Sequence, residues 1–346
     1  MSNIIDVDLI PSWLQKYWNR TNYNNVIAGI NEDDCAIIRV NNATEFVITT
    51  DFLNANPIAK EFGVASYFDL GKLVVASNLS DLFGTGANPI AFLLGVSINK
   101  DTNQDELKNI FAGVKELLNI YGIPLIGGDT KIGNAFSIIG TAIGNTNGTR
   151  KLFTKNSAKI NDDIWVSGCL GDVGASVYYL SNSNKNQELI KIAKSNLTKT
   201  ELPFLKSKLI AEKRIGNGGT DVSDGLGDDL ISLAESSKVG FKIYADKIPC
   251  SSFVTEVAKE FSIQPWLFTF LTGGDFQFIV TTSPKHEREL ISSGFSKIGK
   301  VTPKNMLLNV SGKLFPFPSV GHRDCKGVGF IQEVRDIFNQ LRREIS

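Results

Sequence analysis

The sequence predicts an α/β (α+β) protein of two domains, and three observations carry this prediction. The chain has 346 residues, more than one hydrophobic core usually organises. Apolar strand-like segments alternate along it with segments of helical periodicity, which is typical of proteins that pack helices against sheets. Hydrophobic residues make up 42% of the chain and charged residues 21%, so a sizeable globular core can form.

The first half of the chain contains the clearest elements. Residues 46–50 (FVITT) predict a buried strand that ends at Asp51, and residues 69–86 predict a helix stopped by Gly84 and Gly86. Further strands are expected at 90–98 and 136–143, with a short strand leading into 127–129. Between them, residues 105–121 place apolar side chains at helical spacing: Leu107, Ile110, Phe111, Val114, Leu117 and Leu118.

Residues 144–151 (GNTNGTRK) are polar and turn-forming, and the predicted domain boundary falls there. We expect residues 1–148 to form an N-terminal domain. Residues 149–346 are then a C-terminal domain. Its expected elements are strands at 163–167, 240–245, 276–282 and 295–301, a polar surface insertion at 181–188, a helix at 204–214, a short strand and helix within 220–237, and an amphipathic helix at 330–345.

Charge and composition exclude several classes of function. Lysine plus arginine equals aspartate plus glutamate, at 36 each, which does not favour nucleic acid or a membrane surface as a partner. The four cysteines form no CxxC pair and there are two histidines, so a metal site here relies on oxygen ligands, which select Mg²⁺. The N-terminal segment lacks the basic and apolar regions of a signal peptide, so a cytoplasmic location is expected.

The residues that point to chemistry are aspartates near the ends of apolar segments. They are Asp33, Asp34, Asp51, Asp81, Asp129, Asp221, Asp224 and Asp275. Clustered carboxylates repel one another unless cations bridge them, and Mg²⁺ binds carboxylates and phosphates together. A single such aspartate is more often a turn or helix cap, so the spacing alone leaves both interpretations open.

The nucleotide side is less defined by the residues themselves. There is no GxxxxGK[ST] loop, and no GxGxxG follows a strand. The series Gly168, Gly171 and Gly174 either presents backbone amides to a phosphate or forms a structural turn, and the turn is favoured. Gly216 to Gly219 are interpreted either as a phosphate loop or as a flexible connector. Serine nucleophiles are not expected, because no histidine lies near Ser80, Ser167 or Ser223 in the sequence.

Seven segments, in this order, give the chain a resemblance to a known family. They are EDDCAII (32–38), ITTDFL (48–53), ASNLSDLFGTGANPIAFLLGV (76–96), PLIGGDT (124–130), VSGCLGDVGAS (166–176), DVSDGLGDDL (221–230) and GGDFQFIVT (273–281). The chain resembles the superfamily of aminoimidazole ribonucleotide synthetase, selenophosphate synthetase and a hydrogenase maturation factor, and within it the thiamine-monophosphate kinases most closely. The resemblance implies two α/β domains with ATP between them. Residues 1–148 would bind ATP and Mg²⁺ and pair their sheet with a second subunit, and residues 149–346 would complete the nucleotide and acceptor site.

The resemblance also assigns roles to individual residues. It implies metal-site residues at Asp33, Asp34, Thr50, Asp51, Asp81, Asp129, Asp221 and Asp224. The implied nucleotide-binding residues are Thr50, Gly128, Asp129, Lys155 and Ser223, and the implied catalytic residues are Asp129, Asp224 and Lys155. Lys155 stands where the family usually has arginine, so it supplies charge without a bidentate fork.

The implied reaction is the ATP-dependent phosphorylation of thiamine monophosphate to thiamine diphosphate, by a homodimer with Mg²⁺. The acceptor is a phosphate monoester that is already anionic, so the reaction needs charge neutralisation and alignment rather than a strong base. Segments expected near the acceptor, such as 52–63 and 273–278, differ from the family pattern. The alternatives are a related ATP-dependent enzyme with another small-molecule acceptor, and a non-catalytic ATP-binding relative.

Overall fold

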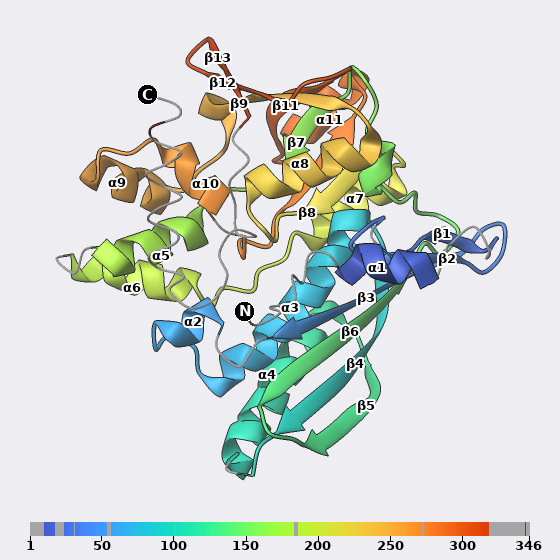
Figure 1. Ribbon diagram of the computed structural model, residues 1–346, viewed down its shortest axis with the longest axis vertical. Helices are drawn as coiled ribbons and strands as arrows, with labels where there is room; N and C mark the ends of the chain where they lie inside the picture. The colour runs from blue at the N-terminus through green and yellow to red at the C-terminus, as the bar shows by residue number, and fades with distance from the viewer. Residues whose placement is uncertain are drawn as a thin grey trace.

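The computed structural model describes residues 10–17, 24–30, 32–53, 57–100, 102–182, 186–271, 273–317 and 343. Each half of the chain forms one β-sheet that packs with its own helices (Figure 1). The chain passes from the first sheet to the second between Asn145 and Asp163. The prediction of a two-domain α/β (α+β) architecture is confirmed.

The first sheet has six strands in the described part of the chain, in the order β1-β2-β3-β6-β4-β5. Its strands are β1 (Val26–Ala28), β2 (Ala36–Arg39), β3 (Glu45–Leu53), β4 (Asn88–Ile98), β5 (Leu125–Ile132) and β6 (Ser137–Asn145). Neighbouring strands are antiparallel except β4 and β5, which are parallel. Burial alternates along β6, which shows that one face of this sheet is covered and the other is open.

Two long helices cover one face of this sheet (Figure 1), α3 (Tyr67–Thr85) and α4 (Gln104–Tyr121). Both begin with a capping box, at Ser66 and at Asn103. Both end at a glycine in the left-handed conformation, Gly86 and Gly122, which a residue without Cβ adopts without strain. The short helices α1 (Ile10–Tyr17) and α2 (Ile58–Glu61) also come from this half of the chain, but Ala59 of α2 packs in the core of the second half.

The second sheet has seven strands in the described residues, in the order β13-β12-β9-β11-β7-β10-β8. They are β7 (Asp163–Val166), β8 (Gly216–Asp221), β9 (Gly240–Tyr244), β10 (Phe278–Thr282), β11 (Ser296–Thr302), β12 (Leu307–Val310) and β13 (Lys313–Pro316). The helices around it are α5 (Asp172–Asn182), α6 (Gln187–Asn196), α7 (Phe204–Glu212), α8 (Leu226–Ser237), α9 (Ser252–Glu260), α10 (Phe268–Leu271) and α11 (Glu287–Ser292). Single 3₁₀ turns lie at η3 (Lys155–Ser157), η4 (Ala245–Lys247), η5 (Pro265–Leu267) and η6 (Pro284–His286).

Helix α3 is the element that joins the two halves. It packs on β3 and β6 of the first sheet, and it also contacts β8, β10 and α7 of the second half. Its last turns are buried on all sides, as for Leu79, Leu82 and Phe83. Gly84 lies against β8 so closely that an added Cβ would be 2.5 Å from the backbone nitrogen of Asp221. The absence of a side chain at Gly84 therefore sets the distance between the two halves.

The structure corrects the interpretation of residues 216–219 as a flexible connector or phosphate loop. They form β8, a wholly buried strand. The glycines are required by close packing, because a Cβ on Gly218 would lie 2.6 Å from the backbone nitrogen of Ala158. The hairpin β12–β13 was not predicted, since each of its strands has only four residues. The helix expected at 330–345 lies outside the described residues, apart from Arg343.

The predicted insertion at 181–188 divides into the end of α5 and the start of α6, and residues 183–185 are not described. Among the described helices, none combines the length and the hydropathy of a membrane-spanning segment.

The contact at Gly84 gives a testable prediction for stability. Gly84→Ala places a methyl group against the backbone of β8, and we expect overpacking to destabilise the protein by about 1–3 kcal/mol. The measurement is the urea midpoint followed by circular dichroism. Gly29→Ala is the matched control, because a Cβ there meets its nearest neighbour at an ordinary 3.6 Å. Equal midpoints for Gly84→Ala and wild type would contradict the packing described.

Candidate active site

Five of the predicted aspartates meet where β3, α3 and β8 come together. Asp51 is on β3, Asp81 is on α3 and Asp221 ends β8, while Asp34 and Asp224 lie in adjoining loops. The charge of Asp34 acts on Asp51, Asp81 and Asp221, and that of Asp224 acts on Asp51. We call these five residues the aspartate cluster. Segments from both halves of the chain therefore contribute to one acidic site.

The pKa values of this cluster are raised. Burial, followed by the charges of Asp34 and Asp224, raises the pKa of Asp51 to about 6. Burial and then Asp34 raise that of Asp221 to about 8. Burial, followed by the charge of Asp221, raises the pKa of Asp81 well above the usual range. Each shift has the same cause, which is negative charge held out of water without enough positive charge nearby.

One turn of α3 holds the cluster through hydrogen bonds. Asn78 Oδ1 accepts the backbone N–H of Asp51 at 3.1 Å. Ser80 Oγ donates to Asp221 Oδ2 at 2.6 Å, and the neighbouring Thr49 Oγ1 donates to Asp81 Oδ2 at 2.5 Å. The second oxygen of Asp221, Oδ1, is buried without a hydrogen-bond partner, which leaves it available to a cation. These three supporting polar residues were not predicted as site residues, although Asn78 and Ser80 alternate with the apolar positions of NLSD.

Lys155 lies beside the cluster and is paired with it. Its backbone N–H donates to Asp33 Oδ2 at 2.8 Å, and its ammonium group forms an ion pair with Asp34 Oδ1. Thr220 Oγ1 donates to Asp34 Oδ2 at 2.9 Å. Burial lowers the pKa of Lys155, but the carboxylate of Asp34 more than reverses this effect, so its pKa lies above the ordinary value and the side chain is charged.

A cavity of about 320 Å³ opens next to this ion pair. It is lined by Glu32, Asp33, Asp34, Lys155, Asp228, Ile231, Ser232, Glu235 and Ser236. Burial and then Asp34 raise the pKa of Asp33 to about 6. Lys155 is the one cationic side chain among the described residues that line this cavity. A phosphate bound in the cavity would therefore compete with Asp34 for the ion pair with Lys155.

Two residues that were predicted to bind the metal lie outside the aspartate cluster within one chain. Thr50 is on the open face of the first sheet, where its hydroxyl contacts that of Thr141 at 2.9 Å. The side chain of Asp129, on the edge strand β5, is 69% exposed and lies 3.3 Å from Lys131 Nζ. Phe52 on β3 pairs with Ile139 on β6, Ile139 pairs with Gly95 on β4, and Gly95 pairs with Asp129 on β5. Asp129 is therefore three strand spacings from β3, roughly 14 Å. The expectation that all the aspartates share one cavity is therefore wrong for Asp129 within one chain.

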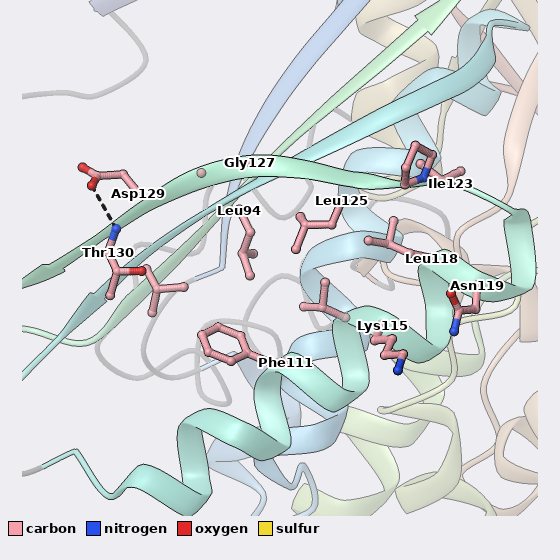
Figure 2. Close-up of a pocket in the computed structure, with 14 residues that line it drawn as sticks. Leu94, Phe111, Lys115, Leu118, Asn119, Ile123, Leu125, Gly127, Asp129 and Thr130 are labelled. Carbon is pink, nitrogen blue, oxygen red and sulfur yellow. Dashed lines mark hydrogen bonds between the residues drawn. The ribbon is translucent and has the colours of Figure 1, made fainter.

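A second and larger cavity, of about 710 Å³, lies between α4 and the edge of the sheet formed by β4 and β5 (Figure 2). Leu94 and Phe111 point into it, and Leu125 and Leu118 line its walls, whereas the carboxylate of Asp129 points away from α4. Gly128 has a φ of 152°, and a Cβ there would collide with the carbonyl oxygen of Leu94. Glycine is thus needed where this cavity meets Asp129 and Thr130.

The predicted turn at the glycine series 168–174 is what the structure contains. The backbone N–H groups of Gly171 and Val173 donate to the carboxylate of Asp275, at 2.6 and 3.0 Å. These amides are therefore occupied and do not form a phosphate cradle. Burial raises the pKa of Asp275 to about 7 despite both bonds.

A third cavity, of about 200 Å³, lies between the glycine turn, the 273–276 segment and Ser223. Its lining is mostly apolar, with Leu53, Pro57, Ile58, Ala59, Leu73, Val173, Leu197 and Phe276 beside Ser77, Ser223, Gly273 and Gly274. Ser223 adjoins Asp224, so this cavity borders the aspartate cluster. Within the described residues, no three Asp, Glu, Cys or His side chains are already arranged around one metal position.

The raised pKa values predict how stability depends on pH. The ordinary carboxyl pKa is 3.8, and the folded values are about 6 for Asp51 and about 8 for Asp221, so the folded protein binds more protons than the unfolded chain between these limits. Stability from these groups is then complete below pH 4 and is lost as the pH rises through 8. We expect the urea midpoint, measured with a chelator, to fall from pH 5 to pH 8.5. Asp221→Asn should flatten this slope, and an unchanged slope would contradict the assignment.

Comparison with known proteins identifies the fold. The family described as AIR synthase related protein, N-terminal domain, matches residues 32–146. Two solved structures share the fold: AaThiL complexed with AMPPCP and TMP (TM-score 0.76, 22% identity, 93% of this chain and 99% of that one), and the thiamine monophosphate kinase of Aquifex aeolicus (TM-score 0.72, 21% identity, 89% and 99%).

Sequence comparison identifies a relative of known activity. Thiamine-monophosphate kinase from Methanocaldococcus jannaschii is 30% identical over 289 residues, which cover 80% of this chain and 86% of that protein. The match covers four fifths of the chain and therefore extends over both halves of the structure. The chain belongs to the thiamine-monophosphate kinase family.

Proposed function

We propose that this protein transfers the γ-phosphoryl group of ATP to thiamine monophosphate, giving thiamine diphosphate and ADP. Membership of the kinase family supports the reaction, and the complex of AaThiL with AMPPCP and TMP supports the pair of substrates. The structural observation that carries the proposal is the buried aspartate cluster, which is paired with Lys155 and bordered at Ser223 by an apolar cavity.

The cluster fits Mg²⁺. All its donors are oxygen atoms, which Mg²⁺ prefers, its pKa values report uncompensated negative charge, and Asp221 Oδ1 is buried without a partner. The residues proposed to hold the metal are Asp33, Asp34, Asp51, Asp81, Asp221 and Asp224. When bound, Mg²⁺ supplies positive charge that offsets the repulsion between the phosphates and the carboxylates.

The larger cavity (Figure 2) is proposed to hold the adenine and ribose of ATP, because its walls at Leu94, Phe111 and Leu125 are apolar and its volume is about 710 Å³. Gly128 then lets the backbone approach the phosphates. Ser223 and Lys155 are proposed to act at the far end of the triphosphate. The hydroxyl of Ser223 would donate a hydrogen bond to a phosphate oxygen, and the ammonium group of Lys155 would balance the negative charge of the phosphate. Asp129 and Thr50 remain proposed nucleotide-site residues, and on the open face of the sheet they would act in the dimer proposed below.

The acceptor is proposed to bind in the apolar cavity beside Ser223. The rings of thiamine would contact Leu53, Leu197 and Phe276, and its phosphate would face Asp224 and the metal site. The acceptor phosphate is already anionic, so the site needs alignment and charge neutralisation more than a base. This agrees with a cluster built from aspartates, with no histidine lining the three cavities.

A homodimer is proposed on the open face of the first sheet. The strand registers place Ile38, Phe46, Ile48, Phe52, Leu93, Ile139 and Ile143 on this face, and Phe52 is 65% exposed. A continuous apolar sheet face of this kind is typical of a subunit interface. We also propose residues 1–148 and 149–346 as the two domains, the first providing the adenosine cavity and the interface.

The dimer proposal is tested by charge placed in the middle of that face. Ile139→Lys should convert the dimer to a monomer, because a buried lysine without a partner opposes association. Light scattering after size-exclusion chromatography measures the mass. Ile192→Lys is the control, since Ile192 is 36% exposed on α6, outside this sheet. A wild-type monomer, or a dimeric Ile139→Lys protein, would refute the interface.

The reaction itself is tested with purified protein, ATP, Mg²⁺ and thiamine monophosphate, with ADP and thiamine diphosphate measured separately. Asp224→Asn and Asp129→Asn should each lower kcat by about 10²–10³-fold. Asp224 acts through the proposed metal site, whereas Asp129 acts only once the proposed second subunit removes water from its face of the sheet. Asp246→Asn is the control. Asp246 lies on η4, away from the cluster, and its carboxylate accepts a hydrogen bond from the backbone N–H of Ser311.

ADP release with another phosphate acceptor, but not with thiamine monophosphate, would reassign the substrate. ATP binding without turnover on any acceptor would identify a non-catalytic relative. Full activity of both aspartate variants would refute the proposed site.

A further inference from the structure

Asp229 is a buried aspartate that neither the sequence pattern nor the family motif assigned. It lies in the first turn of α8 and is 2% exposed. Its Oδ2 accepts two backbone N–H groups, that of Ser223 at 3.1 Å and that of Asp224 at 3.2 Å. We propose that Asp229 is a positioning residue that fixes Ser223 and Asp224 for phosphoryl transfer. This inference rests on the proposed function, which gives those two residues the triphosphate and the metal.

The turn that carries Ser223 and Asp224 is held at both ends. The N–H of Val222 donates to the carbonyl oxygen of Gln277 at 2.8 Å, where β8 ends. Gly225, with a φ of 105°, redirects the chain into α8. Between these points, Asp229 accepts two consecutive N–H groups. Without it, two partly buried donors lose their partner, and the turn is free to rearrange.

The neighbouring segment leaves this turn little room. A Cβ on Gly273 would collide with the carbonyl group of Ser223, so the 273–276 segment packs directly on the turn. Both segments line the apolar cavity proposed for the acceptor. A shift of Ser223 would therefore disturb the triphosphate contact and the acceptor cavity together, and a shift of Asp224 would disturb the metal site.

The position of Asp229 argues against a role as a metal ligand. The oxygen that faces the turn is already used by two N–H donors, and a carboxylate in this arrangement is an anchor for backbone. Burial and the charges of Asp224 and Asp221 raise its pKa well above the usual range, and Lys155 opposes this. Asp275 is another buried aspartate that anchors backbone, since its Oδ2 accepts the N–H of Gly171 and its Oδ1 that of Val173.

Asparagine distinguishes an anchor from a ligand, because its amide oxygen still accepts both N–H bonds while its charge is gone. We expect Asp229→Ala to lower kcat by about 100-fold and Asp229→Asn to stay within about tenfold of wild type. The Mg²⁺ concentration for half-maximal activity should be unchanged in Asp229→Asn. A metal ligand would instead require more Mg²⁺ after this substitution, and equal loss in both variants would overturn the proposal. Wild-type activity in Asp229→Ala would overturn it as well.

Asp162 provides the matched control. It is 4% exposed, and its Oδ2 also accepts two bonds, from the N–H of Lys159 and from Asn217 Nδ2. Asn217 is at the opposite end of β8 from Asp221. Asp162→Ala should therefore reduce thermal stability and leave kcat unchanged. An equal fall in kcat for Asp162→Ala and Asp229→Ala would show that buried aspartates act only through stability, and would overturn the proposal.

A second measurement separates this inference from the proposed function. Calorimetry with Mg²⁺ and the non-hydrolysable nucleotide AMPPCP measures binding without turnover. If wild type binds the nucleotide but does not phosphorylate thiamine monophosphate, the proposed acceptor fails, and Asp229 is still judged by binding. We expect weaker binding for Asp229→Ala and near wild-type binding for Asp229→Asn. Should Asp229→Ala not fold, the Mg²⁺ requirement of Asp229→Asn decides between anchor and ligand.

Discussion

The structure depends on negative charge buried where its two halves meet. Asp34, Asp51, Asp81, Asp221 and Asp224 raise one another's pKa values because they lie out of water with Lys155 as their nearest cationic partner. Such an arrangement opposes folding unless protons or cations neutralise it. The proposed function gives this charge a role, since the same unbalanced charge would attract the Mg²⁺ proposed to bind with ATP.

The architecture makes this arrangement possible through α3. Within one turn, Asn78 fixes the backbone of Asp51, Asp81 enters the cluster, and Ser80 bonds Asp221 across the junction. A helix exposed on one side contacts a single sheet, whereas the last turns of α3 are buried all round and α3 contacts both halves. Fold and site therefore share the same residues, and the close contact at Gly84 controls both the stability of the junction and the spacing of its carboxylates.

Much of this was predictable from local pattern. The periodicity of 105–121 and the glycine stops of 69–86 placed α4 and α3 within a few residues, and the aspartates at segment ends indicated an acidic site. Pattern failed where partners distant in sequence decide the outcome. Residues 216–219 form a strand because Ala158 and Phe153 pack against glycine backbone. Asp229 resembles any acidic residue in a first helical turn, and only the fold shows that it anchors the N–H groups of Ser223 and Asp224.

The separation of Asp129 and Thr50 from the cluster connects catalysis to assembly. Strand register puts both residues on the open face of the first sheet, the face proposed to bind a second copy. In a monomer Asp129 is mostly exposed, with Lys131 as a neighbour, so its charge is screened by water. A subunit packed over that face would remove water from Asp129 and strengthen its interaction with a bound cation. On this argument, Ile139→Lys should weaken nucleotide binding as well as association, although Ile139 lines none of the three cavities.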